Sequence, residues 1–255
     1  NDVVPRALAA LDHNIVNIDL VVQLIGWLSY CNGPEDAERR VYQACPAAMN
    51  AMKVHGVQVR GGKGMPPMLA EGMQSSEAPP GFEMGAPPPE AGEAQAVLVF
   101  LQGIKEIAAV QEALLSTREY AFEPARSWVL PIHSAVPPEE QRLAFARPPP
   151  GVRKVVLATN IAETAITIDD VSFVIDCCRM KENRYDATTR MESLEDVPIS
   201  LANAKQRRGR AGRCRPGVAF HLVTRRTMNA APSHQAPEVQ RMPLDRLILG
   251  IKALN

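Results

Sequence analysis

The sequence has no long apolar run and no metal-binding arrangement of cysteine and histidine. No stretch approaches the ~20 apolar residues that a membrane-spanning helix needs, and no signal peptide is visible, so we expect no membrane partner. The five cysteines form no CxxC pair, and no histidine stands at zinc-ligand spacing from them, which predicts no metal site. Adjacent Cys177 and Cys178 are expected to be buried free thiols. Such thiols indicate a reducing intracellular compartment, cytoplasmic or nuclear.

Acidic residues are missing from one long stretch. Between Val197 and Pro237 there is no Asp or Glu, whereas eight Lys or Arg residues occur there. The formal net charge of the chain is zero, so this segregation creates a local anion-binding surface on a neutral protein. Such a surface favours nucleic acid or phosphates as partners over a membrane.

The basic residues are densest between residues 205 and 215, where six of eleven are Lys or Arg. Good helix formers there, with Ser200 as a possible N-cap, predict a short helix. On that helix Gln206, Arg210 and Arg213 lie at i, i+4 and i+7 and share one face. One amide and two guanidiniums in that arrangement suit a polyphosphate. A solvated basic face or a localisation signal is the alternative.

Gly209 and Gly212 interrupt this predicted helix. Each costs a helix roughly 1 kcal/mol relative to alanine. Close approach of another surface or of a ligand would explain why glycine is used here.

The chain divides into four regions, and its ends are typical of a segment of a longer protein. Residues 1–33 are a lead-in and a first helix, in which Leu20, Leu24, Trp27 and Leu28 form an apolar stripe after a cap at Asn17 or Asp19. Residues 34–94 are rich in Pro, Gly and Met, which predicts a disordered insertion. Residues 95–240 are the main domain, and residues 241–255 begin a further helix. Within the insertion, residues 56–64 are superficially similar to a phosphate-binding P-loop, but the spacing fails by one and Gly64 replaces the Ser or Thr.

Continuous apolar strands alternate with helices after Gln95. The expected strands are 96–101, 128–132, 154–158, 171–176 and 217–223, with a helix after the first strand that points Ile104, Ile107 and Leu115 inward and another helix at 139–145. Strands that are apolar on both faces predict an α/β fold with a mainly parallel sheet covered by helices on both sides. Ligands of such sheets bind at the carboxyl ends of the strands. Polar or small residues follow three of these ends, and we expect them to share a site: Gly103, His133, Ser134, Thr159, Asn160, Glu163 and Thr164.

In this order the segments resemble the second RecA-like domain of the DEAH-box (DExH) family of superfamily 2 RNA helicases. Residues 97–103 resemble the fourth helicase motif, residues 157–169 the fifth and residues 206–213 the sixth. The likeness covers residues 14–30 and 95–255. Residues 180–194 resemble the protruding β-hairpin of the family, and residues 243–254 resemble the helix that leads into its winged-helix region.

The resemblance implies roles for particular residues. Gln206, Arg210 and Arg213 match positions that face the γ-phosphate of ATP, with the two arginines as fingers. Thr167 and Asp169 match positions near the ribose, and Phe145 matches an aromatic residue that stacks on the base, with a core helix residue as the alternative. The positions that match contacts to the RNA backbone are Gly103, Ser134, Thr159, Asn160 and Thr164.

Some residues depart from the family pattern. Gln102 replaces the usual Pro of the fourth motif, and Ala165 replaces a common Ser of the fifth. Cys177 and Cys178 stand where a small hydroxyl residue and Gly are more usual. None of these changes removes a proposed phosphate contact.

The sequence also has no GxxxxGK[ST] and no DExH box. The family carries these, with its Mg²⁺ ligands, on the first RecA-like domain, so we expect this segment alone to hydrolyse no ATP. The implied function is the C-terminal motor domain of an ATP-dependent RNA helicase, whose partners are RNA, the first RecA-like domain and accessory activator proteins. The alternatives are a non-catalytic RNA-binding remnant or regulatory subunit, and a motor that acts on DNA.

Overall fold

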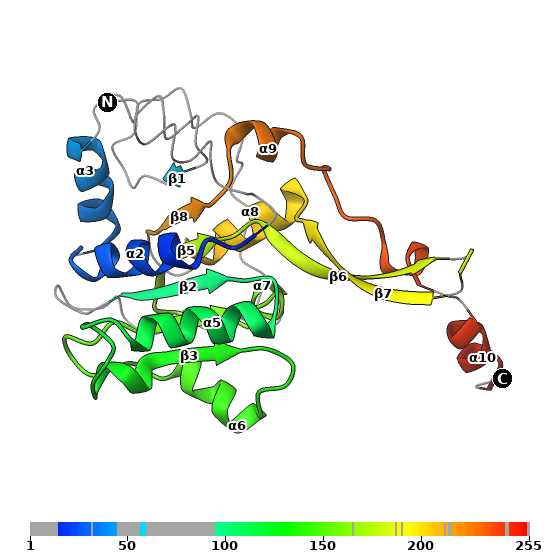
Figure 1. The fold of residues 1–255 in the computed structure, drawn as a ribbon, viewed down its shortest axis with the longest axis horizontal. Helices are drawn as coiled ribbons and strands as arrows, with labels where there is room; N and C mark the ends of the chain where they lie inside the picture. The colour runs from blue at the N-terminus through cyan, green and yellow to red at the C-terminus, as the bar shows by residue number, and fades with distance from the viewer. Residues whose placement is uncertain are drawn as a thin grey trace, which may run out of the picture.

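The computed structural model describes residues 15–31, 33–44, 57–59, 95–164, 166–186, 188–189, 191–211, 213, 216–242 and 245–253 (Figure 1). In chain order the elements are α2 (Ile18–Ser29), α3 (Pro34–Ala44), β1 (Val57–Val59), β2 (Ala96–Phe100), α5 (Ile104–Leu115), the 3-10 helix η2 (Ala125–Trp128), β3 (Val129–Ile132), α6 (Pro138–Gln141), the 3-10 helix η3 (Arg142–Phe145), β4 (Val155–Ala158), α7 (Ile161–Thr164), β5 (Val171–Asp176), β6 (Arg179–Asp186), β7 (Met191–Pro198), α8 (Leu201–Ala211), β8 (Val218–His221), α9 (Arg225–Asn229), the 3-10 helix η4 (Glu238–Gln240) and α10 (Asp245–Ala253). None of the helices within these ranges is long and apolar enough to cross a membrane.

Six strands form one sheet in the order β1-β8-β5-β2-β4-β3. Strand β1 is antiparallel to its neighbour, and the other five strands are parallel. The last residues of these five strands lie in one register row, in the order His221, Asp176, Phe100, Ala158 and Ile132. The five parallel strands therefore end together, and the segments that follow them meet at one edge of the sheet.

Helices cover both faces of the sheet, as the apolar strands predicted. Val97 and Val99 face a core that contains residues of α2 and α5. The alternate residues of β2, among them Leu98 and Phe100, face a second core with residues from η3, α7 and α8. Because successive side chains of a strand point to opposite faces, a strand buried on both sides is apolar at every position. The five strands predicted after Gln95 are confirmed within one residue or two at each end.

The inward faces of two helices differ from the sequence-based expectation. Helix α2 begins after Asn17, whose side chain accepts a hydrogen bond of 2.9 Å from the backbone N–H of Leu20. Its fully buried residues are Val21, Ile25 and Leu28, so the inward position predicted for Leu28 is confirmed, whereas Leu24 and Trp27 lie at the rim of the core and Leu20 is only partly buried. In α5, Ile107 is buried as expected, but Ile104 in the first turn is 48% exposed. The predicted helix over residues 139–145 is split into α6 and η3.

The region predicted as a disordered insertion contains two ordered elements. Helix α3 and strand β1 lie inside residues 34–94, so the prediction is wrong for those residues. The remaining residues of the insertion lie outside the described part of the chain. The helix-forming run Pro34–Ala44 carries Glu35 and Asp36 in its first turn, where negative charge stabilises a helix.

The two ends of this insertion are held side by side by one buried arginine. The guanidinium of Arg153 donates 2.7 Å hydrogen bonds to the backbone carbonyls of Cys31 and Gln95. It also lies over the ring of Phe173, with 5.2 Å between the guanidinium carbon and the ring centroid. The chain therefore leaves and re-enters the domain at the same place.

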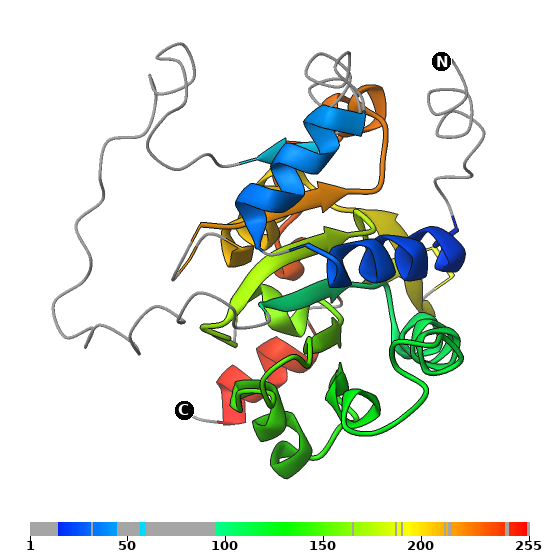
Figure 2. The ribbon, with the colours of Figure 1, turned by 90° about the vertical axis from the view of Figure 1, so that its left-hand side faces the viewer.

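A two-stranded hairpin of β6 and β7 projects away from the main sheet (Figure 1). The sequence predicted this hairpin, and the pairing extends from Arg179–Pro198 at its base to Asp186–Met191 at its far end. The chain after η4 runs along β6, because the N–H of Tyr185 donates to the carbonyl of Arg241 at 3.0 Å. Seen from the side, helix α2 crosses one face of the sheet, next to α5 (Figure 2).

Candidate functional site

Helix α8 carries the basic segment and begins as the sequence predicted. The hydroxyl of Ser200 accepts a hydrogen bond of 3.2 Å from the N–H of Asn203, which caps the helix. The helix ends at Ala211, so Arg213 lies beyond it, and the expected helical face at i, i+4 and i+7 is wrong for Arg213. Gln206 is exposed on the helix.

Arg210 and Arg213 nevertheless meet at one crevice. Its lining is made of Leu98, Ala162, Ile166, Thr167, Ile168, Val171, Arg210 and Arg213. Loss of hydration lowers the pKa of the Arg210 guanidinium, and the positive charge of Arg213 lowers it further. Two guanidiniums that repel each other beside an exposed threonine form a place where an anion is favourable.

Arg210 is also bound to the loop after β4. Its guanidinium donates to the carbonyl of Ile166 at 2.8 Å and to the carbonyl of Glu163. Because both acceptors are backbone groups, Arg210 fixes the position of residues 163–166 relative to α8. The sequence predicted Arg210 as a phosphate contact and gave no indication of this second set of contacts.

A buried ionic network lies on the inner side of α8, and the sequence analysis missed it. Arg207 is 0% exposed and is bound by Glu163 (Nε–Oε2, 3.0 Å) and Asp176 (Nη1–Oδ1, 2.9 Å). Its guanidinium carbon lies 4.9 Å from the ring centroid of Phe100. Glu163 also accepts a hydrogen bond of 2.5 Å from the side-chain amide of Asn203. The network joins α7, the end of β5 and α8.

The protonation states of this network follow from burial and pairing. Burial opposes ionisation of Asp176, but the charge of Arg207 and the contact with His221 outweigh it and lower the pKa of Asp176 to about 2. Burial likewise opposes the charge of Arg207, and the two carboxylates reverse the effect and raise its pKa. Both groups are therefore charged at neutral pH.

The burial of Arg207 could have been predicted from the spacing of residues in α8. Ala204, Arg207 and Ala211 are the buried residues of α8, at i, i+3 and i+7. Two small apolar residues at that spacing mark the inner face of a short helix. An arginine between them on the same face must be buried, and a buried arginine requires carboxylate partners.

The candidate RNA contacts are brought to one edge of the sheet, as predicted. Ser134 follows β3, Thr159 and Asn160 follow β4, and Gly103 follows β2. Since β2, β4 and β3 are neighbours in the sheet, these residues lie in adjacent loops. Ser134 and Asn160 are exposed, as is Thr164 at the end of α7, whereas Thr159 is half-buried.

Gly103 is placed differently from the others. It is buried, and a Cβ atom there would lie 2.6 Å from Nζ of Lys181. Lys181 belongs to β6 and is paired with Glu106 of α5 at 3.6 Å. A side chain at this position would displace the end of the Lys181 side chain rather than backbone.

Of the three residues expected near the base and ribose, Phe145 and Asp169 lie in one region, whereas Thr167 lines the crevice with Arg210 and Arg213. Phe145 ends η3 and is 48% exposed, which rules out the core alternative. Asp169 faces Arg147 with 3.7 Å between Oδ2 and Nη2, and Thr167 is exposed.

Buried Lys154 links the two sides of this group. Its Nζ donates to the carbonyls of Ala144 and Ala146 at 2.7 and 2.8 Å, on either side of Phe145, and it pairs with Asp170 at 2.9 Å. Burial lowers the pKa of Lys154, and the carboxylate of Asp170 opposes that shift. The sequence provided no indication of this link, because the pattern identifies Lys154 only as the polar first residue of a predicted strand.

The sequence of this chain is similar to a known domain family and to known proteins. Residues 90–215 match the family model described as the helicase conserved C-terminal domain. The DExH-box ATP-dependent RNA helicase DExH2 of Arabidopsis thaliana is 51% identical over 160 residues, which is 63% of this chain and 10% of that protein. The human putative ATP-dependent RNA helicase DHX57 is 51% identical over 162 residues, which is 63% of this chain and 12% of that protein.

A solved structure agrees with these matches. The crystal structure of the E. coli DExH-box NTPase HrpB superposes with a TM-score of 0.54 at 37% identity, and the match covers 62% of this chain and 19% of that chain. The present chain thus spans between a tenth and an eighth of the length of the two curated relatives.

Proposed function

Because residues 90–215 are a C-terminal RecA-like domain of the DEAH/DExH helicase family, we propose that the chain acts as the second motor domain of an ATP-dependent RNA helicase. The proposal rests on one observation above the others. Arg210 stands at the candidate phosphate crevice and also holds the backbone of residues 163–166, beside the candidate RNA contact Thr164. One side chain therefore connects the two candidate sites.

The residues present fit half of a nucleotide site. The crevice at Arg210 and Arg213 has a volume of about 10 Å³, whereas pockets that enclose a small ligand measure roughly 300–1,000 Å³. We infer that this domain contributes contacts to a ligand that a first RecA-like domain mainly encloses. The P-loop and DExH box would lie on that domain, and so would the Mg²⁺ ligands.

This half-site would act by electrostatic stabilisation of a phosphoryl group. ATP would supply the phosphoryl group on which negative charge develops during transfer. Arg213 is exposed beside Arg210, and the exposed Gln206 lies one turn earlier on α8. Guanidiniums stabilise phosphate charge through paired N–H donors that lysine does not have. Phe145 and Asp169 would hold the base and the ribose.

Movement at the crevice would be transmitted to RNA through two connections. Arg210 holds the carbonyls of Glu163 and Ile166, and Arg207 holds the carboxylate of Glu163. Helix α7 and the loop that carries Asn160 and Thr164 would therefore shift together with α8. We propose that closing and reopening of the domains moves these residues along the RNA backbone.

Binding of single-stranded RNA tests the candidate contacts at the sheet edge. The chain and its T159A/N160A variant are titrated into a fluorescent RNA, and the affinity is measured by anisotropy at several salt concentrations. Loss of backbone contacts should weaken binding several-fold for every sequence tested and should reduce the salt dependence, since phosphate contacts carry no sequence information. S116A is the control, because Ser116 lies at the opposite end of α5 from Gly103.

The outcomes separate the proposal from its alternatives. Equal affinity of the double variant and S116A would contradict the assignment of the RNA edge. Equal binding of matched RNA and DNA strands would favour a motor that acts on DNA, since contacts to 2′-hydroxyl groups distinguish the two. If the chain binds RNA more tightly than DNA, but substitution of Arg210 does not change the rate of ATP hydrolysis by the intact protein, a non-catalytic RNA-binding role would be favoured.

A further inference from the structure

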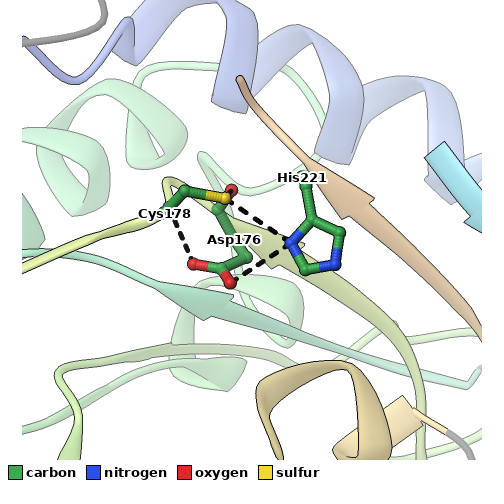
Figure 3. A group of neighbouring side chains, drawn as sticks. All are labelled: Asp176, Cys178 and His221. Atoms are coloured by element: carbon green, nitrogen blue, oxygen red, sulfur yellow. Dashed lines mark hydrogen bonds and ion pairs between the residues drawn. The ribbon is translucent and has the colours of Figure 1, made fainter. Parts of the chain in front are cut away.

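Three potential metal ligands meet behind Arg207, at the ends of β5 and β8 (Figure 3). Asp176 is the last residue of β5, His221 is the last residue of β8, and Cys178 follows β5 by two residues. Their exposed fractions are 0%, 5% and 4%. The sequence predicted no metal site because Cys178 and His221 are far apart in the chain, but the parallel pairing of β5 with β8 places Asp176 opposite His221.

Two of the three distances among these ligand atoms match those around a tetrahedral metal ion, and all three atoms lie within 4.8 Å of one another. Nδ1 of His221 lies 3.3 Å from Oδ2 of Asp176 and 3.5 Å from Sγ of Cys178. Zinc binds nitrogen and carboxylate oxygen at ~2.0 Å and thiolate sulfur at ~2.3 Å, so a tetrahedron about zinc has N–O edges of ~3.3 Å and N–S edges of ~3.5 Å. Figure 3 shows both ligands converging on the same ring nitrogen.

The thiol of Cys178 can donate to the backbone carbonyl of Asp176 at 3.4 Å, but one carboxylate oxygen of Asp176 is left without a hydrogen-bond partner among the described residues. A ring nitrogen carries at most one proton, so Nδ1 cannot donate to Asp176 and also accept from the thiol of Cys178. Oδ1 of Asp176 accepts from Nη1 of Arg207 and from the N–H of Cys178, at 2.9 and 2.8 Å. Oδ2 of the same carboxylate is buried and has no hydrogen-bond partner among the described residues. A buried carboxylate oxygen without a hydrogen-bond partner, 3.3 Å from a ring nitrogen, is suited to a cation.

The charge balance of the surroundings also favours a divalent cation. Glu163 and Asp176 contribute two negative charges and Arg207 one positive charge, which leaves one negative charge in a buried space. A metal-bound thiolate of Cys178 would add a second. A cation of charge +2 brings the cluster to neutrality, and neutrality greatly reduces the cost of burying the group.

The backbone at Cys178 is held in an unfavourable conformation. Its φ of +59° is left-handed, which costs a residue other than glycine about 1–2 kcal/mol. Glycine would relieve that strain and would leave Asp176 and His221 without a sulfur ligand. Cysteine therefore occupies this position at a local conformational cost.

We propose that Asp176, Cys178 and His221 bind a divalent ion of the zinc class. Oδ2, Sγ and Nδ1 supply three ligands, and the fourth position is left for water. Binding replaces the thiol proton of Cys178, which leaves to solvent as the sulfur–metal bond forms. Arg207 and the N–H of Cys178 hold the other carboxylate oxygen in place. The ion would cross-link the ends of β5 and β8 next to the carboxylate that anchors Arg207.

Cobalt titration of the whole chain tests this site. The reduced, metal-stripped protein is titrated with Co²⁺, whose bond to a thiolate gives a charge-transfer band in the near ultraviolet. We expect the band to saturate at one equivalent and to disappear when Zn²⁺ is added. C178G should show no band, and it should remain folded because glycine accepts the left-handed backbone.

Cys177 provides the matched control. It is a neighbouring buried thiol that belongs to the core with residues of α2 and α5, and its sulfur is not among the three clustered ligand atoms. C177A should retain the band, and added Zn²⁺ should raise the thermal midpoint of the wild-type chain and of C177A but not of C178G. Absence of the band from the wild-type chain, or its persistence in folded C178G, would overturn the proposal and would leave an ordinary hydrogen-bonded cluster.

Discussion

The inner and outer faces of helix α8 use the same residue type in opposite ways. Arg207 on the inner face is fully buried between two carboxylates, and its positive charge lowers the pKa of buried Asp176. Arg210, three residues later, is half-buried, contacts backbone carbonyls and borders a crevice with exposed Arg213. Two arginines in one basic run therefore have different surroundings, one a buried ionic network and the other the proposed ligand site.

The comparison teaches that burial decides what a charged residue can do. A buried pair that loses one partner leaves an uncompensated charge, which is costly. A half-exposed arginine that loses its contacts leaves groups that water can reach, which costs little. Substitutions on the two faces should therefore affect different measurements.

The largest effect on stability is expected at Arg207. R207M keeps the volume of the side chain and leaves Glu163 and Asp176 without their cation. We expect unfolding free energy to fall by about 3–5 kcal/mol, measured by urea denaturation of the purified chain. K205M on the exposed side of the same helix should change it by less than about 0.5 kcal/mol. Equal stability of the two variants would show that the ionic network does not hold the fold.

Arg210 should behave in the opposite way. In the intact helicase, R210A should reduce the rate of ATP hydrolysis by about 10³-fold or more, because an arginine that stabilises the transferred phosphoryl group contributes that much. Unfolding free energy of the isolated chain should fall by only about 1 kcal/mol. K205A is the control for the loss of a positive charge from α8, and its rate should stay close to that of the wild type. If R210A hydrolyses ATP at the wild-type rate, Arg210 is not an active-site residue.

The smallest effect is expected at Gly209, and its sign is the informative part. A Cβ atom at Gly209 meets no described atom within 4 Å, so alanine fits the chain as it stands. G209A should stabilise the isolated chain by up to about 1 kcal/mol, measured by thermal unfolding. If another domain or RNA approaches this face, the same variant should impair the intact helicase. Full activity together with higher stability would mean that glycine is not needed here for close approach.

The sheet was predictable from sequence, and the buried polar network was not. A parallel strand covered on both sides must be apolar throughout, so a continuous apolar run such as residues 96–100 predicts a buried strand. The carboxyl ends of those strands then locate the site without any knowledge of side-chain contacts. Arg207 was missed because a basic residue inside a basic run is typical of a surface. Only the spacing of Ala204 and Ala211 around it marks the inner face.

Other errors had equally local causes. Helix α2 is apolar on most sides, so periodicity alone could not distinguish the face with Val21 and Ile25 from the neighbouring face with Leu20 and Leu24. The extent of α8 was overestimated, since the matched motif continues past the residue at which the helix ends. The proximity of Cys178 to His221 depends on strand order, which no local pattern contains.

Arg153 has a consequence for how this domain can change over time. It fastens the carbonyls before and after the insertion to the same guanidinium, so the separation of those two points does not depend on what lies between them. Doubling the length of a flexible connection costs only about 0.6 kcal/mol in chain entropy. Insertion or deletion between β1 and β2 should therefore disturb the sheet little, whereas loss of α3 or β1 would remove Ala37 from the core and the edge strand that pairs with β8. The same position would accept a foreign domain or a reporter protein while leaving the strand ends, and the residues they carry, where they are.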